Sequence, residues 1–172
     1  FAAGALADLV NGDFEAGSTG WGMSNPPGWS VGVQAGGNPG DHGHIQSPWG
    51  DSAGEACFVQ DFQCGEDDPT GETHCIITLD YYLHILDASP GSGRVKVLID
   101  GNVEYVSPSG LDWIDWSTIT LEVPCGFHVI ALCLEVDPQN NGWEAGFDNV
   151  RAECDDSTPA HSSDWTTVKS LY

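Results

Sequence analysis

The first residues in the chain that could do chemistry are two histidines beside an aspartate. Asp41-His42-Gly43-His44 places both imidazoles on the same side of an extended segment, where they could hold a transition metal. The alternative is that both are polar loop residues, and we favour it. The sequence contains no His-Glu-x-x-His motif, and paired carboxylates carry little information in a chain with 26 Asp and Glu residues. We therefore predict a non-catalytic protein.

The seven tryptophans form a second group of candidate functional residues. Sugar rings present C–H faces that stack on exposed aromatic rings, while nearby amides and carboxylates bind the hydroxyl groups. Gln60, Tyr82 and His84 are expected on one open sheet face. The alternative is that the tryptophans fill the core of a small sandwich. The candidate ligand-binding residues, all in or beside predicted loops, are Trp29, Trp49, Trp113, Trp116 and Trp143.

The elements that must position these residues are β-strands. The chain has 22 Gly and 10 Pro, and no segment keeps a helical period. In the longest β-rich run, 75–86, Ile77, Leu79 and Leu83 alternate with polar residues and are expected to face the core. An opening strand at 9–15 is expected to pair with the closing strand. Strands are also predicted at 29–33, 44–46, 57–63, 75–86, 94–100, 103–106, 113–123, 127–136 and 143–154.

Three short motifs connect this pattern to a known family. The opening Leu9–Glu15 (LVNGDFE), Gly20-Trp21 and the closing 147–150 (FDNV) together resemble the jelly-roll carbohydrate-binding modules of bacterial secreted proteins. The resemblance covers residues 9 to 154. It implies an antiparallel jelly-roll β-sandwich of about eight or nine strands.

The same resemblance implies a structural calcium ion that joins the first and last strands. Glu15 and Asp148 match the acidic ligand positions of the family, and Asp13 and Asn149 are supplementary candidates. Oxygen ligands from both chain ends would suit the coordination that calcium prefers. The alternative is that these acids lie exposed on a solvated rim.

The six cysteines predict a disulfide-stabilised protein in an oxidising, extracellular or cell-surface setting. Their spacing lacks the paired Cys-x-x-Cys of a zinc site, and reduced buried thiols are the alternative. Cys64–Cys75 is the pair we favour, because it closes a turn-rich loop between two strands. Cys154 is expected to bond to Cys125 or Cys57. The predicted disulfide residues are Cys57, Cys64, Cys75, Cys125, Cys133 and Cys154.

The charge of the chain limits its partners. A formal net charge of −22 would repel nucleic acid and anionic membranes, so we exclude both as partners. The longest apolar run, 129–134, is too short to span a bilayer, and we expect no membrane insertion. The acidity itself fits a soluble or salt-adapted surface, calcium binding, an acidic habitat or a charged polymer.

The two ends of the chain suggest self-association. The predicted organisation is an N-terminal arm at 1–8, a sandwich at 9–154, a polar linker at 155–163 and a docking strand at 164–172. An extended segment can add to the open edge of a sheet, here through Trp165, Val168, Leu171 and Tyr172. The predicted function is therefore a homo-oligomeric subunit of an extracellular filament or tube. The alternatives are a secreted carbohydrate-binding module with a polysaccharide partner, and a tail that docks on its own domain.

Overall fold

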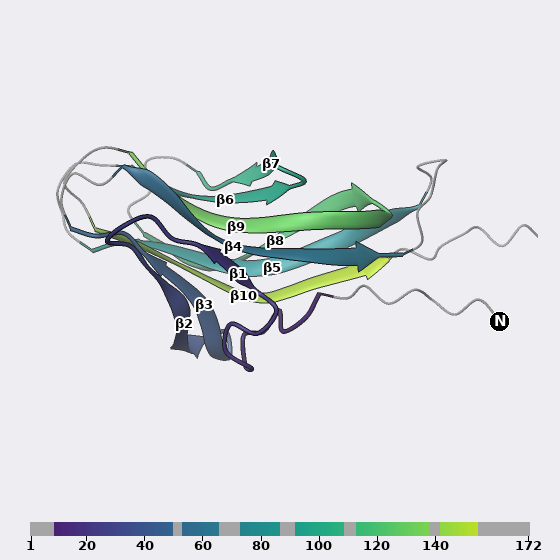
Figure 1. Cartoon of the computed structure of the whole chain (residues 1–172), viewed down its shortest axis with the longest axis horizontal. Coiled ribbons are helices and arrows are strands. Elements are labelled where there is room, and N and C mark those ends of the chain that lie inside the picture. Colours follow the sequence, from purple (N-terminus) through teal and green to yellow (C-terminus); the bar gives the residue numbers. More distant parts are fainter. Residues whose placement is uncertain are drawn as a thin grey trace, which may run out of the picture.

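The computed structural model shows a sandwich of two five-stranded antiparallel sheets (Figure 1). The structure describes residues 9–49, 53–65, 73–86, 92–108, 113–137 and 142–154, with the side chain of Cys154 excepted. No helix occurs within these ranges, and none is therefore long and apolar enough to cross a membrane. The predicted all-β, jelly-roll-like sandwich is confirmed, with ten strands in place of eight or nine.

The strands alternate between the sheets along much of the chain. Sheet A has the order β1-β4-β9-β6-β7, and sheet B has the order β2-β3-β10-β5-β8. The strands of sheet A are β1 (Gly22–Ser24), β4 (Gly54–Cys64), β9 (Gly126–Val136), β6 (Gly93–Ile99) and β7 (Asn102–Val106). The strands of sheet B are β2 (Ser30–Gly37), β3 (Gly40–Gln46), β10 (Trp143–Cys154), β5 (His74–Ile85) and β8 (Trp113–Pro124).

The core lies between the sheets and follows the period of two that the sequence predicts. On β5, Ile77, Leu79 and Leu83 are buried in the core, and the intervening Thr78 and His84 point to the outer face of sheet B. On β9 of sheet A, the alternating residues Ile130, Leu132 and Leu134 are likewise buried in the core. The largest contribution to stability therefore comes from apolar side chains that each sheet turns toward the other.

The opening segment differs from its prediction as a strand. Asn11 and Phe14 both have φ of 55°, and the N–H of Phe14 donates to the carbonyl of Asn11, so residues 9–15 form turns. The turn buries the Phe14 ring, which stacks on Trp21 at a centroid distance of 5.2 Å. One backbone hydrogen bond, 2.9 Å from Val150 N to Gly12 O, links this segment to the closing strand.

The closing strand departs from the strict alternation of an ideal β-strand. Its register with β5 shifts between Asp148 and Arg151, and Asn149 within the shift has φ of 52°. The extra residue of this bulge changes the parity of the strand. Asp148 and Arg151, three residues apart, therefore share the outer face of sheet B.

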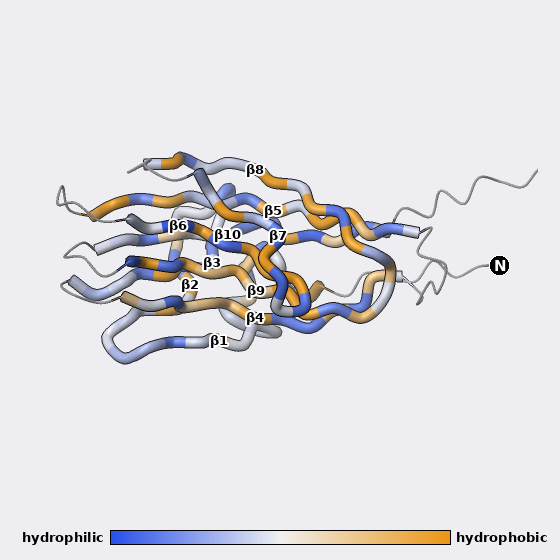
Figure 2. Tube along the Cα trace, turned by 90° about the horizontal axis from the view of Figure 1, so that it is seen from above, coloured by the Kyte–Doolittle hydropathy of each residue, from blue (hydrophilic) through white to orange (hydrophobic). Residues whose placement is uncertain are grey.

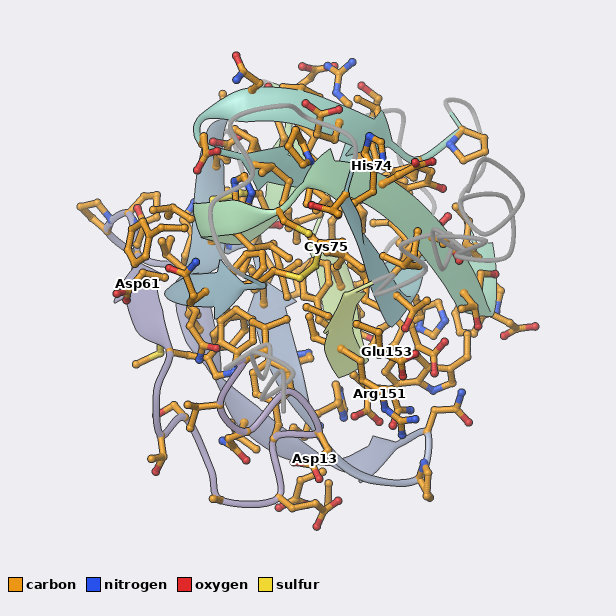
Figure 3. The ribbon with its side chains drawn as sticks, turned by 90° about the vertical axis from the view of Figure 1, so that its right-hand side faces the viewer. Asp13, Asp61, His74, Cys75, Arg151 and Glu153 are labelled. Atoms are coloured by element: carbon orange, nitrogen blue, oxygen red, sulfur yellow. A yellow bond between two sulfur atoms is a disulfide. The ribbon has the colours of Figure 1, made fainter. Side chains whose placement is uncertain are left out.

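Two disulfides join strands in different ways. Cys57–Cys133 links the neighbouring strands β4 and β9. Cys64–Cys75, the pairing favoured from the sequence, links sheet A to sheet B (Figure 3). Because Cys57 bonds to Cys133, the expected Cys154–Cys57 bond is wrong. Among the residues that the structure describes, Cys125 forms no disulfide, and the side chain of Cys154 lies outside them. Four of the six predicted disulfide cysteines are thus confirmed.

The two disulfides should stabilise the fold unequally. Cys57–Cys133 spans a sequence separation of 76 and Cys64–Cys75 one of 11. Loop entropy predicts a loss of about 4 kcal/mol in the free energy of unfolding for the first and about 3 kcal/mol for the second. Urea unfolding of the double variants Cys57→Ala/Cys133→Ala and Cys64→Ala/Cys75→Ala measures both. All four cysteines are buried, so the variants are matched, and a larger loss for the second pair would contradict this account.

Candidate functional site

Six rings gather on the outer face of sheet B. His42 and His44 come from β3, Tyr82 and His84 from β5, and Trp113 and Trp116 from β8. The two rings on β3 are two residues apart in sequence, and so are the two rings on β5. Each of these two pairs therefore shares one face of its strand. We call these six residues the aromatic face.

The strand between β3 and β5 makes room for these rings. At this point β10 carries Gly146, which is paired with His44 of β3 on one side and with Tyr82 of β5 on the other. A Cβ atom at this position would overlap the Tyr82 ring and lie 2.8 Å from Cδ2 of His42. The absence of a side chain at Gly146 lets the two rings meet above β10, with Nε2 of His42 3.2 Å from Oη of Tyr82.

The rings of β5 and β8 form a stack that ends at an exposed indole. His84 lies between Tyr82, at a centroid distance of 4.5 Å, and Trp113, at 3.5 Å with an interplanar angle of 9°. Nε1 of Trp113 donates to Asp115 at 2.8 Å, which fixes the orientation of the indole. Trp113 nevertheless remains 58% exposed. It therefore offers a held, solvent-facing aromatic surface.

Trp116 closes the other side of the cluster. Its ring meets Tyr82 edge-on at 4.9 Å and His42 at 5.5 Å. Trp113 and Trp116 are three residues apart, and they share the face because the β5–β8 register shifts between Tyr81 and Leu83. The shift therefore brings both indoles to one side of β8.

Glu144 of β10 binds two imidazoles from the flanking strands. Its Oε2 lies 3.3 Å from Nε2 of His44, and its Oε1 lies 3.2 Å from Nδ1 of His84. The hydrogen bond from His44, and then that from His84, lower the pKa of Glu144 against the opposing effect of burial. An ionised, half-buried carboxylate therefore sits among the rings as a hydrogen-bond acceptor.

The interior of the cluster is neutral. Burial and, after it, the neighbouring His44 lower the pKa of His42 to about 4, while Glu144 and Asp41 act in the opposite direction. Burial also raises the pKa of Tyr82, and Glu144 adds to the shift. At neutral pH an uncharged imidazole thus faces an uncharged phenol.

The predicted calcium ligands lie on the middle of β10 and in the opening turns, against the β2–β3 hairpin. Asp148 is fully buried and accepts backbone N–H groups from Asn38 at 2.5 Å and Asn149 at 2.7 Å. Glu15 accepts the N–H of Asp41 at 2.9 Å. Both carboxylates therefore bind the β2–β3 hairpin, from opposite ends of the chain. Burial raises the pKa of Asp148, and the charges of Asp80 and Asp13 add to the shift.

The hairpin is shaped around these two carboxylates. A Cβ atom at Gly40 would overlap the carboxylate of Glu15, and one at Gly37 would lie 2.7 Å from Oδ2 of Asp148. Carboxylate oxygens are ligands that a hard cation such as calcium prefers. The groups recorded on these two carboxylates are backbone N–H donors, from Asn38 and Asn149 to Asp148 and from Asp41 to Glu15.

Side chains alone do not complete such a site. Among the described residues, the one group of three metal-capable side chains within 4.8 Å of one another is Glu55, Cys57 and Cys133. Its two sulfurs are joined in a disulfide, so it is no metal site. His42 and His44 are strand residues rather than loop residues, and their Nε2 atoms are hydrogen bonded to Tyr82 and Glu144, respectively.

The structure divides the predicted tryptophans into two groups. Trp113 and Trp116 belong to the aromatic face, and Trp49 is exposed in the loop after β3, beside Gly142. Trp29 and Trp143 are 6% and 1% exposed and pack in the core, which corrects their assignment as ligand-binding residues.

Gln60 also lies elsewhere than predicted. It points to the core side of sheet A, where its amide donates to Val10 O and Gly20 O, and it does not share a face with Tyr82 and His84. Glu144 was not among the predicted site residues, because its place between two histidine-bearing strands depends on the pairing of β10 with β3 and β5. The predicted assembly residues Trp165, Val168, Leu171 and Tyr172 lie outside the described residues.

The fold is shared with several solved structures, although the sequence matches no protein-family model and no curated protein. The K3 cleaved adhesin domain of Lys-gingipain from Porphyromonas gingivalis W83 has a TM-score of 0.55 at 14% identity, over 88% of this chain and 99% of that one. TmCBM61, solved with β-1,4-galactotriose, has a TM-score of 0.50 at 16% identity, over 86% and 98%. A cyclase from Fischerella sp. has a TM-score of 0.50 at 16% identity, over 90% and 98%. At these identities the likeness shows the fold alone, a jelly-roll sandwich like that of carbohydrate-binding modules.

The buried His42 should make stability depend on pH. Its pKa is about 4 in the folded chain against 6.5 for the free side chain, so between these values the unfolded state binds the extra proton. The contribution of neutral His42 to the free energy of unfolding is therefore fully present above about pH 6.5. It decreases by roughly 3 kcal/mol as the pH drops toward 4. The variant His42→Asn should lose this part of the slope in urea unfolding between pH 7 and 4. The more exposed His74→Asn is the control, and an identical slope for wild type and His42→Asn would contradict the assignment.

Proposed function

We propose that this chain is a non-catalytic extracellular carbohydrate-binding module whose ligand lies on the aromatic face of sheet B. The observation that carries the proposal is the Trp113 indole, 58% exposed yet fixed by stacking on His84 and by its bond to Asp115. A sugar ring can stack on this indole without the entropic cost of first ordering the side chain. Glu144, next to the stack, supplies an acceptor for hydroxyl groups.

The charge of the face defines the class of sugar. Glu144 and the nearby Asp80 and Asp115 are acidic, and the chain as a whole carries a formal charge of −22. Of the basic residues that the structure describes, Arg94 and Lys96 lie on sheet A, where they pair with Glu55, Glu135 and Asp137. Arg151 lies on the outer face of sheet B, toward the end of β10 that is opposite to Glu144. An acidic polysaccharide would be repelled from the aromatic face, so the proposed ligand is a neutral glycan.

Binding without catalysis is supported by the hydrogen bonds of the face. The hydrogen bonds of His42, His44 and His84 described above go to Tyr82 and Glu144, and none goes to a serine, threonine or cysteine that could act as a nucleophile. The galactotriose complex of TmCBM61 offers a precedent for sugar binding on this fold, and the Fischerella cyclase shows that the fold also occurs in an enzyme.

The extracellular setting rests on the two disulfides, which persist in oxidising compartments. Assembly of copies into a filament or tube stays a prediction, because the residues it invokes lie outside the described part of the chain.

Loss of the exposed indole should weaken glycan binding. Isothermal titration with a panel of neutral oligosaccharides, such as cello-, xylo- and galacto-oligosaccharides, should identify a ligand, and polygalacturonate should not bind. Trp113→Ala should raise Kd at least about tenfold, equivalent to about 1.4 kcal/mol. Phe127→Ala is the matched control, because Phe127 is 59% exposed on the opposite sheet. The proposal fails if no neutral glycan binds, or if Trp113→Ala leaves Kd unchanged.

We also propose that calcium binds between Glu15, Asp148 and the β2–β3 hairpin, with Asp13 nearby. Calcium at a hundredfold excess over its Kd should stabilise the fold by about 3 kcal/mol, and chelation should reverse the gain. Asp148→Asn and Glu15→Gln should abolish the response of the melting temperature to calcium. Asp61→Asn, an exposed acid on sheet A, should respond like the wild type. If neither calcium nor chelator changes the melting temperature, these residues are not calcium ligands.

A further inference from the structure

The outer edge of β8 is open in the part of the chain that the structure describes. β8 has 12 residues, ends the strand order of sheet B and pairs only with β5 there (Figure 2). An edge strand carries a row of backbone N–H and C=O groups that can pair with another strand. This edge is therefore a template for one more strand.

The other three edges of the sandwich are poorer templates. β1 has three residues and β7 has five, so both are short. β2 has eight residues, but three are glycines and its register shifts between Ala35 and Gly37. β8 contains no glycine, and its one proline is its last residue. Its register with β5 shifts between Ile114 and Ser117, and the stretch 117–124 is the longest regular row of backbone groups on the four edges.

The core side of β8 is incompletely covered. Ile114, Ile119 and Leu121 pack against the core but are only partly buried. A sixth strand beside β8 would bring side chains of its own over these three residues and remove apolar surface from water. The edge therefore lacks both hydrogen-bond partners and apolar cover.

The chain leaves the sandwich close to this edge. Cys154, at the end of β10, is opposite Cys75 on β5, which is opposite Val123 near the end of β8. Figure 3 shows Cys75 and Glu153 at this end of the molecule. The next free position in the sheet is thus three strand spacings from β10, about 14 Å. The nine residues of the linker 155–163 can span up to about 30 Å.

The direction of the chain also suits this edge. β10 and β8 are both antiparallel to β5, so they run the same way. A segment that returns after Cys154 runs the opposite way and meets β8 as an antiparallel neighbour, without a crossover. The N-terminal arm is badly placed by comparison, because Val10 bonds to Gln60 on β4, beside β1, across the sandwich from β8 (Figure 2).

We propose that residues 164–172 of the same chain add to β8 as the sixth antiparallel strand of sheet B. The segment DWTTVKSLY is rich in β-branched and aromatic residues, and each of its two alternating sets contains two large apolar side chains. Trp165 and Leu171 fall on one face, and Val168 and Tyr172 fall on the other. Counted from Pro124, nine paired residues reach Trp116 and leave Trp113 free for a ligand.

Amide hydrogen exchange of the full-length chain tests this proposal. The wild type should protect the outward-facing N–H groups of β8, and Val168→Pro should speed their exchange at least tenfold, because proline breaks a strand ladder. Ser163→Pro, in the linker, is the matched control and should exchange like the wild type. The amides of β4 and β9 should be unaffected in both variants, which separates loss of docking from unfolding.

The concentration dependence distinguishes the chain's own segment from that of a neighbour. Protection of β8 that is equal at low and high protein concentration, in a monomer by light scattering, is the expected result. Protection that rises with concentration together with larger particles would mean that copies exchange the segment, and would overturn the proposal. Rapid exchange of β8 in the wild type, or unchanged protection in Val168→Pro, would also overturn it.

Discussion

The aromatic face depends on Glu144, whose carboxylate accepts hydrogen bonds from His44 on β3 and His84 on β5. These bonds tie three neighbouring strands together through side chains, on top of the backbone ladder. They also orient the His84 ring on which Trp113 stacks. Because strand pairing fixes the positions of all these residues, the face is organised before any ligand arrives, which lowers the entropic cost of binding.

The electrostatics of the face follow from its degree of burial. His42 and Tyr82 lie deepest, and burial keeps both uncharged at neutral pH. Glu144 lies nearer the solvent, and its bonds to His44 and His84 keep it ionised. The result is a neutral aromatic interior with an anionic acceptor at its opening, a combination suited to hydroxyl groups beside an apolar ring face.

The sequence predicts the strands better than it predicts their neighbours. The alternation in β5 was enough to separate Leu79 from His84, and Cys64–Cys75 followed from a short loop. The pairing of β10 with both β3 and β5 depends on contacts distant in sequence, so Glu144 could not be placed between two histidines. Trp143 shows a second limit, since composition does not tell a core tryptophan from an exposed one. The bulge at Asn149 shows a third, because one extra residue reversed the parity expected for the end of β10.

The most direct test of the central claim is an NMR titration that follows the indole N–H signals of the tryptophans while a neutral oligosaccharide is added. If the ligand binds the aromatic face, the signals of Trp113 and Trp116 shift together and saturate, and those of the core residues Trp21, Trp29 and Trp143 stay in place. Saturable shifts that spare Trp113 and Trp116 and appear instead at another tryptophan would contradict the account.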